Sequence, residues 1–385
     1  MNKIRALTGG QASAFAMRQI NPGVVPVYPI TPQTPIVEFF AKYAAAGDVD
    51  SEVITVESEH SALSCAIGAA AAGVRAMTAT SSQGLALMFE MLYIASGLRL
   101  PIVMSVANRS LSAPINIHCD HSDSLGVRSA GWIQIYCENP QEVYDSTLLA
   151  IRLAEGAQTP VMVLQDGFIT SHCVEGVKIL EDEIVTEYIG KYRSAYNLLN
   201  HEKPLTVNPT VPDSIYAEAK AEQEKAIKSV GDLFIAESQS LAELTGRPLK
   251  ICEAYGTDEA EAILVVQSSM AGTVRSVVED LRKKGLPVGL IKNRLYRPFP
   301  DKEISRLIGG CPVVGVIDRT AAFGEYPPLY SDVLASIYDK DIHPYMESYQ
   351  LGLGGTDVRA EEIEAIFMNL LDEAKGLKAS KNHGS

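Results

Sequence analysis

Short apolar runs rich in β-branched residues alternate with Ala-rich helical patterns over the first 175 residues, and this alternation constrains the fold more than any other feature. The runs predict strands at 23–28, 52–57, 75–81, 100–108, 133–137 and 159–166. The segments between them predict helices at 9–20, 34–46, 58–73, 84–97 and 140–157. Such an order is typical of a parallel sheet covered by helices, and continuously apolar strands fit a sheet buried on both faces.

A second alternation of the same kind begins near residue 260 and predicts a second α/β domain, in which residues 287–299 are expected to form one strand. Two domains also fit the length, because 385 residues exceed the usual size of a single hydrophobic core. The expected division is a first parallel-sheet domain at 1–250, whose connecting segment is 176–250, and a second parallel-sheet domain at 251–385.

The region between the two alternations carries weaker patterns. Residues 176–212 are mixed in character and contain prolines, so they predict a winding connection. Residues 214–246 predict a single long helix, which Gly246 and Pro248 end.

Charge and cysteine usage narrow the class of function. The formal net charge is −14, which disfavours nucleic acid and anionic membranes as main partners because both reward a basic face. No run of 18 apolar residues occurs and the first residues lack an apolar signal core, so we expect a cytoplasmic protein without a membrane span. The six cysteines are dispersed without a C-x-x-C, so any iron–sulfur cluster is expected on another chain.

Polar residues follow several of the predicted strands of the first domain. Because the carboxyl ends of parallel strands lie at one edge of a sheet, where ligands bind, we expect these residues to lie close together. They are Thr31, Glu59 and Arg109, together with Ser81, Ser82 and Gln83 from the segment "MTATSSQG".

The segment "VVPVYPITPQTP" holds Thr31 in a rigid setting. Pro32 bars the preceding residue from the helical basin, and Pro29 fixes its own φ. The Thr31 hydroxyl is thereby preorganised toward a ligand. The alternative is a rigid strand-to-helix turn in which a threonine caps the helix that begins near residue 34.

Glu59 and Arg109 each have an ordinary structural explanation beside the functional one. Ser58 is a good N-cap, and an acidic residue in the first turn of a helix interacts favourably with the helix dipole. Glu57 offers the same benefit, so the pattern does not choose between the two glutamates. The guanidinium of Arg109 suits a carboxylate, although a surface ion pair is the commoner fate of an arginine.

Eight strings in chain order carry a resemblance to a known family. They are "YPITPQTP", "ESEHSA", "TSSQGLALM", "ANRSLSAPINIHCDHSD", "GWIQIY", "QDGFITSH", "LYRPFP" and "DRTAAFG". Together they resemble the α subunit of pyruvate:ferredoxin oxidoreductase, within the 2-oxoacid:ferredoxin oxidoreductase family. The resemblance implies a thiamine-diphosphate pyrimidine-binding domain followed by a transketolase C-terminal-like domain.

The resemblance also implies roles for individual residues. Glu59 takes the position of the glutamate that contacts the cofactor pyrimidine, where a carboxyl sheltered from water shares a proton with ring nitrogen N1′. Thr31 and Arg109 take the positions that hold the substrate carboxylate. Ser82 and Gln83 are further candidates for contact with the cofactor.

The remaining parts of such an enzyme are expected on other chains. The sequence has no G-D-G motif for the diphosphate and its Mg²⁺, and no cluster cysteines. The resemblance therefore implies a β-type subunit that carries the diphosphate, Mg²⁺ and a [4Fe-4S] cluster, with γ- and δ-type subunits, ferredoxin and coenzyme A as further partners. The implied reaction converts pyruvate to acetyl-CoA and CO₂ and reduces ferredoxin.

Other interpretations stay open. The oxoacid could be branched-chain or 2-oxoglutarate, and the chain could be a non-catalytic scaffold. A non-oxidative thiamine decarboxylase is disfavoured because it carries its own diphosphate motif. The segment "HCDHSD" at 118–123 looks like a metal site, but adjacent residues cannot all converge on one ion, so we expect no metal. The segment "SSMAGT" at 268–273 could bind an anion at a helix start, although a tight turn is favoured.

Overall fold

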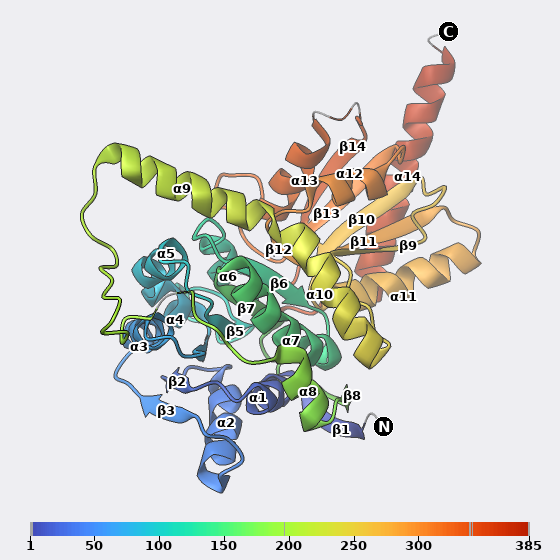
Figure 1. Ribbon diagram of the computed structural model, residues 1–385. Helices are drawn as coiled ribbons and strands as arrows, with labels where there is room; N and C mark the ends of the chain where they lie inside the picture. The colour runs from blue at the N-terminus through green and yellow to red at the C-terminus, as the bar shows by residue number, and fades with distance from the viewer. Residues whose placement is uncertain (1–2, 196, 339, 341, 384–385) are drawn as a thin grey trace.

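The computed structural model describes residues 3–195, 197–338, 340 and 342–383. In these residues two five-stranded sheets lie side by side, each with helices on both faces (Figure 1). This confirms the predicted α/β class with two parallel-rich sheets. The division into domains at residue 250 stays a proposal.

The first sheet has the strand order β12-β6-β7-β5-β4, and all its pairs are parallel except β12–β6. Its strands are β4 (Met77–Thr80), β5 (Val103–Asn108), β6 (Ile133–Cys137), β7 (Val161–Asp166) and β12 (Leu295–Arg297). A parallel pair, β2 (Val24–Val27) and β3 (Glu52–Thr55), adjoins β4 through a bridge between Val24 and Ala76. The predicted strands of the first domain therefore all form, within a few residues of their expected ends.

Helices cover both faces of the first sheet, as predicted. One apolar cluster packs beneath the first face, whose helices are α1 (Gly9–Ile20), α2 (Thr34–Ala46) and α7 (Pro140–Ala157). A second cluster packs on the opposite face, whose helices are α3 (Glu59–Ala71), α4 (Ser82–Leu87), α5 (Phe89–Gly97) and the short α6 (Ser122–Gly126). The second cluster continues into the other five-stranded sheet through residues such as Ile263 and Val314. The two sheets therefore share buried apolar surface.

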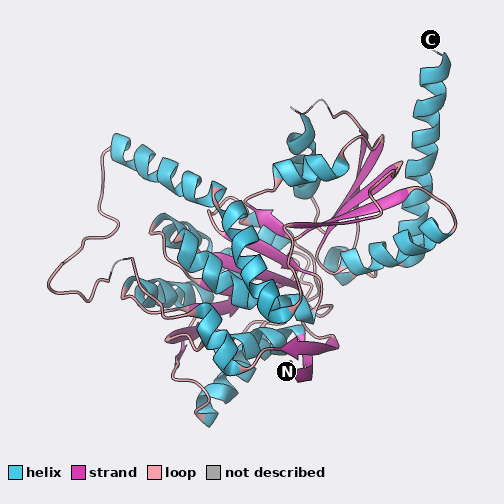
Figure 2. Ribbon diagram, turned by 45° about the vertical axis from the view of Figure 1, so that its right-hand side comes forward, coloured by secondary structure: helices cyan, strands magenta, loops and turns pink. Residues whose placement is uncertain are grey.

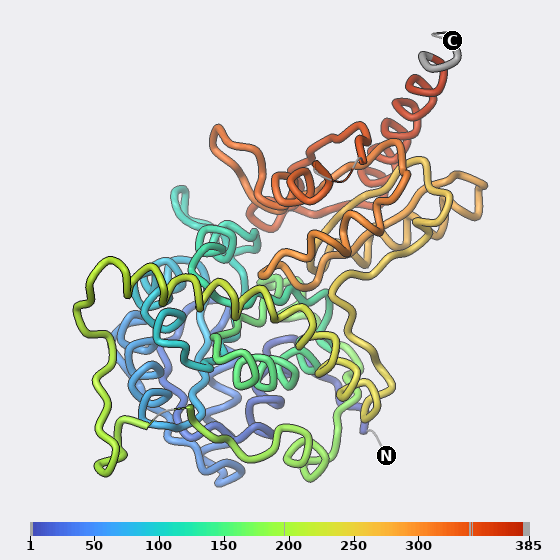
Figure 3. The backbone as a smooth tube through the Cα atoms, turned by 45° about the horizontal axis from the view of Figure 1, so that its top comes forward, coloured from blue at the N-terminus to red at the C-terminus, as the bar shows by residue number. Residues whose placement is uncertain are grey.

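The second sheet has the order β14-β13-β10-β11-β9, with β9 antiparallel. Its strands are β9 (Cys252–Tyr255), β10 (Ala262–Gln267), β11 (Val288–Asn293), β13 (Val313–Asp318) and β14 (Tyr345–Gln350). On one face pack α11 (Met270–Lys283) and α14 (Ala360–His383), and on the other α12 (Asp301–Ile308) and α13 (Pro328–Tyr338) (Figure 2). The far end of α14 projects away from both sheets (Figure 3). None of the helices in the described ranges is long and apolar enough to cross a membrane.

The single strand predicted at 287–299 is wrong. The segment forms two strands that belong to different sheets, because β11 joins the second sheet and β12 pairs with β6 of the first. The chain crosses between the sheets at Arg294, whose buried guanidinium forms ion pairs with Glu142 and Glu253. A buried charge needs partners of opposite sign, and here one partner comes from α7, which packs on the first sheet, and the other from β9 of the second sheet.

The connecting segment is more ordered than predicted. It contains β8 (Val174–Ile179), which pairs antiparallel with the unpredicted β1 (Lys3–Thr8), and the helix α8 (Asp182–Ile189). The single helix predicted at 214–246 is wrong, because the segment forms α9 (Asp213–Lys228) and α10 (Val230–Thr245). α9 buries no residue and runs along the outside of the first domain, whereas α10 packs on α7 (Figure 1). The helix ends at Gly246, as predicted, and this glycine adopts the left-handed conformation.

Candidate active site

The turn that contains Thr31 connects β2 to α2 at the carboxyl edge of the first sheet. Thr31 is exposed, and the Thr31–Pro32 peptide is cis. The N-cap of α2 is Gln33, whose side-chain oxygen accepts a hydrogen bond from the Ile30 N–H at 3.2 Å. Thr31 therefore does not cap the helix, and its side chain is left for another role.

Glu59 is the first residue of α3 and is only 7% exposed. Ser58 caps the helix by accepting the Ser61 N–H at 3.2 Å, as predicted. Glu57, by contrast, is exposed and accepts a hydrogen bond from the Ser61 hydroxyl. Among the residues that the structure describes, none donates a hydrogen bond to the Glu59 carboxylate. The fold thus separates the two glutamates, which the sequence pattern could not do.

Gly84 forms a close wall beside the Glu59 carboxylate. A Cβ atom at this position would lie 2.7 Å from Glu59 Oε1 and 2.5 Å from Thr80 Oγ1. The hydroxyls of Thr80 and Ser81 are buried and have no hydrogen-bond partner in the described part of the chain. Buried polar groups normally find partners, so this group of a carboxylate and two hydroxyls is suited to a polar ligand.

Arg109 follows β5 and is 7% exposed. Its Nη1 donates to the Thr31 carbonyl oxygen at 3.0 Å, and its Nε donates to the Asn116 carbonyl oxygen at 3.0 Å. An arginine offers five N–H groups, so within the described residues these two bonds leave Nη2 and one N–H of Nη1 for a ligand. The structure therefore brings Thr31 and Arg109 together, as the sequence predicted.

Asp123 ties the loops of this edge together, and sequence reasoning missed this role. Its buried carboxylate accepts the N–H groups of Ser82 at 2.9 Å and Arg109 at 3.0 Å, and Asn108 Nδ2 donates to it at 2.7 Å. Burial raises the pKa of Asp123 to about 6, against the effect of these donors. The only signal was its place in "HCDHSD", where it was considered as a metal ligand.

Ser82 and Gln83 begin α4 beside this network. The Ser82 hydroxyl donates to the Ser110 carbonyl oxygen at 2.6 Å, so it links the loops after β4 and β5. Gln83 is half-buried, and its Oε1 lies 2.5 Å from Ser82 Oγ. Contact between these two residues and a cofactor stays a prediction.

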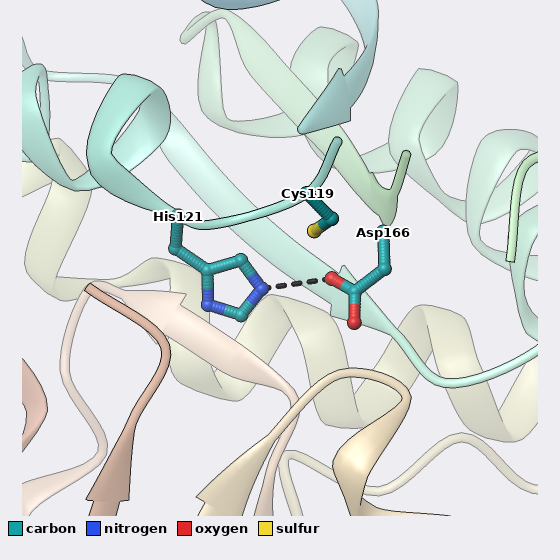
Figure 4. A group of neighbouring side chains, drawn as sticks. All are labelled: Cys119, His121 and Asp166. Carbon is teal, nitrogen blue, oxygen red and sulfur yellow. Dashed lines mark hydrogen bonds and ion pairs between the residues drawn. The ribbon is translucent and has the colours of Figure 1, made fainter. Parts of the chain in front are cut away.

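Cys119, His121 and Asp166 form a buried cluster where the two sheets meet (Figure 4). His121 Nε2 lies 2.8 Å from Asp166 Oδ1, and the Arg319 guanidinium lies 4.0 Å from the other carboxylate oxygen. Burial would raise the pKa of Asp166, but Arg319 and His121 hold it well below its usual range. Burial also raises the pKa of the Cys119 thiol well above its usual value, which disfavours the thiolate that a metal needs.

The anion at the start of α11 is the Asp166 carboxylate. Ser268 Oγ donates to it at 2.7 Å, the Ser269 N–H donates at 3.2 Å, and the Ser269 hydroxyl also contacts it. The segment "SSMAGT" therefore binds an anion inside the protein. Asp166 in this way ties the end of β7 in the first sheet to the segment after β10 in the second sheet, which gives the cluster a structural role. The expectation of no metal stays a prediction.

Comparisons with known proteins identify the family. Residues 15–236 match the family model described as pyruvate flavodoxin/ferredoxin oxidoreductase, thiamine diphosphate-binding, and residues 260–363 match pyruvate:ferredoxin oxidoreductase core domain II. The chain belongs to the pyruvate:ferredoxin oxidoreductase family. This confirms the family predicted from the sequence.

Relatives in this family match nearly the whole chain. Over 369 residues the chain is 48% identical to the pyruvate synthase subunit PorA of Thermotoga maritima, covering 95% of this chain and 94% of the relative. It is 42% identical to the PorA subunit of Methanocaldococcus jannaschii, covering 95% of both chains. It is 40% identical to the ketoisovalerate oxidoreductase subunit VorA of Pyrococcus horikoshii, and the match covers 98% of this chain and 96% of the relative. The relatives are named as subunits, so family members work in multisubunit enzymes.

Solved structures share the fold. A 2-oxoglutarate:ferredoxin oxidoreductase from Magnetococcus marinus, with 2-oxoglutarate, coenzyme A and succinyl-CoA bound, superimposes with a TM-score of 0.76 at 19% identity. The match covers 96% of this chain and 65% of that chain. A split-gene transketolase matches with a TM-score of 0.54 at 10% identity, over 96% of this chain and 99% of that one.

The thiamine diphosphate named by the family model fits the residues around Glu59. An aminopyrimidine presents ring nitrogens and an amino group, and the buried Glu59 carboxylate with the unpartnered Thr80 and Ser81 hydroxyls offers matching acceptors and donors. Gly84 packs so closely against Glu59 and Thr80 that a Cβ at this position would displace the Glu59 carboxylate.

Proposed function

We propose that this chain is the α-type subunit of a pyruvate:ferredoxin oxidoreductase, which converts pyruvate and coenzyme A to acetyl-CoA and CO₂ and reduces ferredoxin. The observation that carries the proposal is the pair of Thr31 and Arg109, joined at 3.0 Å, at the same sheet edge as the buried Glu59. The identity of 48% to a pyruvate synthase subunit supports the choice of substrate.

Glu59 holds a proton in this proposal. Its carboxylate would meet N1′ of the cofactor pyrimidine and share a proton with it, at a position sheltered from water. Thiamine diphosphate, when bound, supplies the carbon nucleophile and takes up the electrons released with CO₂. Gly84 and the Ser58-capped start of α3 keep the carboxylate in place.

Arg109 and Thr31 bind and orient the substrate. The free N–H groups of the guanidinium would take the carboxylate of the 2-oxoacid, and the exposed Thr31 hydroxyl would donate to it. Both residues act before CO₂ departs, so they set the orientation of the substrate and do not transfer electrons.

The rest of the active centre belongs to partner chains in this proposal. A β-type subunit would carry the diphosphate, Mg²⁺ and a [4Fe-4S] cluster, because this chain has no G-D-G motif and no cysteine pair in C-x-x-C spacing. Subunits of γ and δ type and ferredoxin complete the complex. A cytoplasmic location and the division into 1–250 and 251–385 belong to the same proposal.

A branched-chain oxoacid is the second candidate, because a ketoisovalerate oxidoreductase subunit is 40% identical to the chain. The test is the turnover of pyruvate, 2-oxoisovalerate and 2-oxoglutarate by the assembled complex. We expect kcat/KM to be highest for pyruvate, and a higher value for another oxoacid would overturn the choice of substrate. The isolated chain with thiamine diphosphate and Mg²⁺ should release no CO₂ from pyruvate.

A further inference from the structure

Asn116 contacts both the substrate-binding arginine and the second domain. Its carbonyl oxygen accepts the hydrogen bond from Arg109 Nε at 3.0 Å. Its side-chain Nδ2 donates to the carbonyl oxygen of Gly354 at 3.0 Å. Gly354 lies in the turn Leu353–Gly355, which follows β14 of the second domain. One residue therefore connects the guanidinium to a segment more than 200 positions away in the chain.

The glycines of this turn fit closely against the loop. A Cβ on Gly354 would lie 2.5 Å from Asn116 Nδ2, and a Cβ on Gly355 would lie 2.4 Å from His118 Cβ. Both glycines have a positive φ, of 57° and 79°. Because any other residue would collide with the loop and be strained, the turn is matched to this contact.

Further hydrogen bonds fix the loop on both sides of Asn116. Its side-chain Oδ1 accepts the His118 N–H at 2.7 Å, and the His118 carbonyl oxygen accepts the Ser110 N–H at 3.0 Å. On the second-domain side, the Gly355 N–H donates to the Cys119 carbonyl oxygen at 2.7 Å. The loop that presents the Asn116 carbonyl oxygen to Arg109 is thus fixed both by its own hydrogen bonds and by a hydrogen bond from the turn at Gly355.

We propose that Asn116 is a positioning residue for substrate binding. Held by Gly354, it places its carbonyl oxygen so that Arg109 presents its free N–H groups to the carboxylate of the 2-oxoacid. Asn116 acts through Arg109 and does not touch the substrate, and the second domain in this way controls substrate affinity. This inference rests on the proposed role of Arg109.

The test compares Asn116→Ala, Gly354→Ala and the double variant in the assembled complex. Each single change removes or displaces the same hydrogen bond, so we expect the KM for pyruvate to rise about fivefold. We expect kcat and the affinity for thiamine diphosphate to stay near wild type. The double variant should be no worse than the poorer single variant, because both changes act on one contact.

Gly246→Ala is the matched control. Gly246 is also left-handed, with φ 72° and ψ 11°, but in the described part of the chain no atom lies within 4 Å of the added Cβ. Gly246→Ala therefore introduces a backbone strain similar to that of Gly354→Ala but does not touch the loop. The KM of the Gly246→Ala variant for pyruvate should be unchanged. A KM that rises equally in the control, or additive effects in the double variant, would overturn the inference.

Arg109→Lys separates this inference from the proposed function. If Arg109→Lys leaves the KM for pyruvate unchanged, the role of the arginine fails and the inference fails with it. If Arg109→Lys raises the KM while Asn116→Ala and Gly354→Ala do not, only the positioning role of Asn116 is overturned.

Discussion

The guanidinium of Arg109 donates from Nη1 to the carbonyl oxygen of Thr31 at 3.0 Å, which joins the loop after β5 to the turn after β2. Strand β4 lies between these two strands, and Gly84 from the helix after β4 stands against the Glu59 carboxylate. Successive loops at one sheet edge thus carry Arg109, which is proposed to bind the substrate, and Glu59, which is proposed to contact the cofactor. This adjacency is the basis of the proposed function.

Replacing Glu59 by Gln should abolish most of the activity. The amide cannot exchange a proton with the pyrimidine nitrogen as a carboxyl does, so we expect pyruvate-dependent ferredoxin reduction to fall about a hundredfold or more. Glu57→Gln is the control, because Glu57 is exposed two positions away and bonds only to Ser61 in the described residues. Equal losses in both variants would contradict the assignment.

Gly84→Ala tests the packing around Glu59. The added Cβ would lie 2.7 Å from Glu59 Oε1, so the carboxylate must move. We expect weaker binding of thiamine diphosphate and a kcat reduced about tenfold, with the thermal transition of the complex nearly unchanged. Gly68→Ala in α3 is the control, since its added Cβ has no atom of the described residues within 4 Å other than those of the helix's own backbone. Normal cofactor affinity in Gly84→Ala would show that the carboxylate position is unimportant.

Arg109→Lys should weaken substrate binding more than turnover. Lysine keeps the charge but loses the planar fork that contacts Thr31 and Asn116 and is proposed to bind a carboxylate at the same time. Steady-state kinetics with pyruvate should show a KM raised about tenfold or more. A change in kcat alone, with KM preserved, would mean that Arg109 does not bind the carboxylate.

Glu142→Gln should lower the free energy of unfolding of the chain and should make this free energy less dependent on pH. Burial alone would raise the pKa of Glu142, but Arg294 and Lys292 hold it at about 2, below the ordinary 4.5. Because the unfolded chain takes up the proton first, the stability from this carboxylate is present above about pH 4.5 and lost as the pH falls toward 2.

Urea unfolding of the chain at several pH values measures this effect. Near neutral pH the variant leaves two buried cations short of one partner, so the free energy of unfolding should fall by about 3 kcal/mol. The difference in the free energy of unfolding between wild type and Glu142→Gln should become smaller as the pH drops below 4.5. Glu364→Gln removes an exposed ion pair with Lys284 and should have little effect at any pH. A gap that widens on acidification would mean that Glu142 does not stabilise the fold through its charged form.

Much of the fold could be predicted because its signals are local. Apolar runs and glycine or proline at element ends located the strands of the first sheet, and Ser58 was recognised as the cap of α3. The crossing of the chain at Arg294 could not be predicted, because it depends on ion pairs with Glu142 and Glu253. The pairing of β1 with β8 depends in the same way on segments far apart in sequence.

The site was predicted in outline and missed in detail. Thr31, Glu59 and Arg109 could be proposed as site residues because each follows a predicted strand, and their roles stay predictions. The helix pattern alone did not choose between Glu59 and Glu57; the resemblance pointed to Glu59, and the structure adds that its carboxylate is buried whereas Glu57 is exposed. Asp123 was missed because its carboxylate accepts hydrogen bonds from backbone N–H groups of two other loops, at Ser82 and Arg109. No residue pattern reveals such contacts.

The most direct measurement is a structure of the assembled complex with thiamine diphosphate and a non-reacting pyruvate analogue bound. We expect a Glu59 oxygen within hydrogen-bond distance of the pyrimidine N1′, and Arg109 Nη2 in contact with the carboxylate of the analogue. A pyrimidine bound away from Glu59, or an analogue whose carboxylate is held by other residues, would contradict the proposed function.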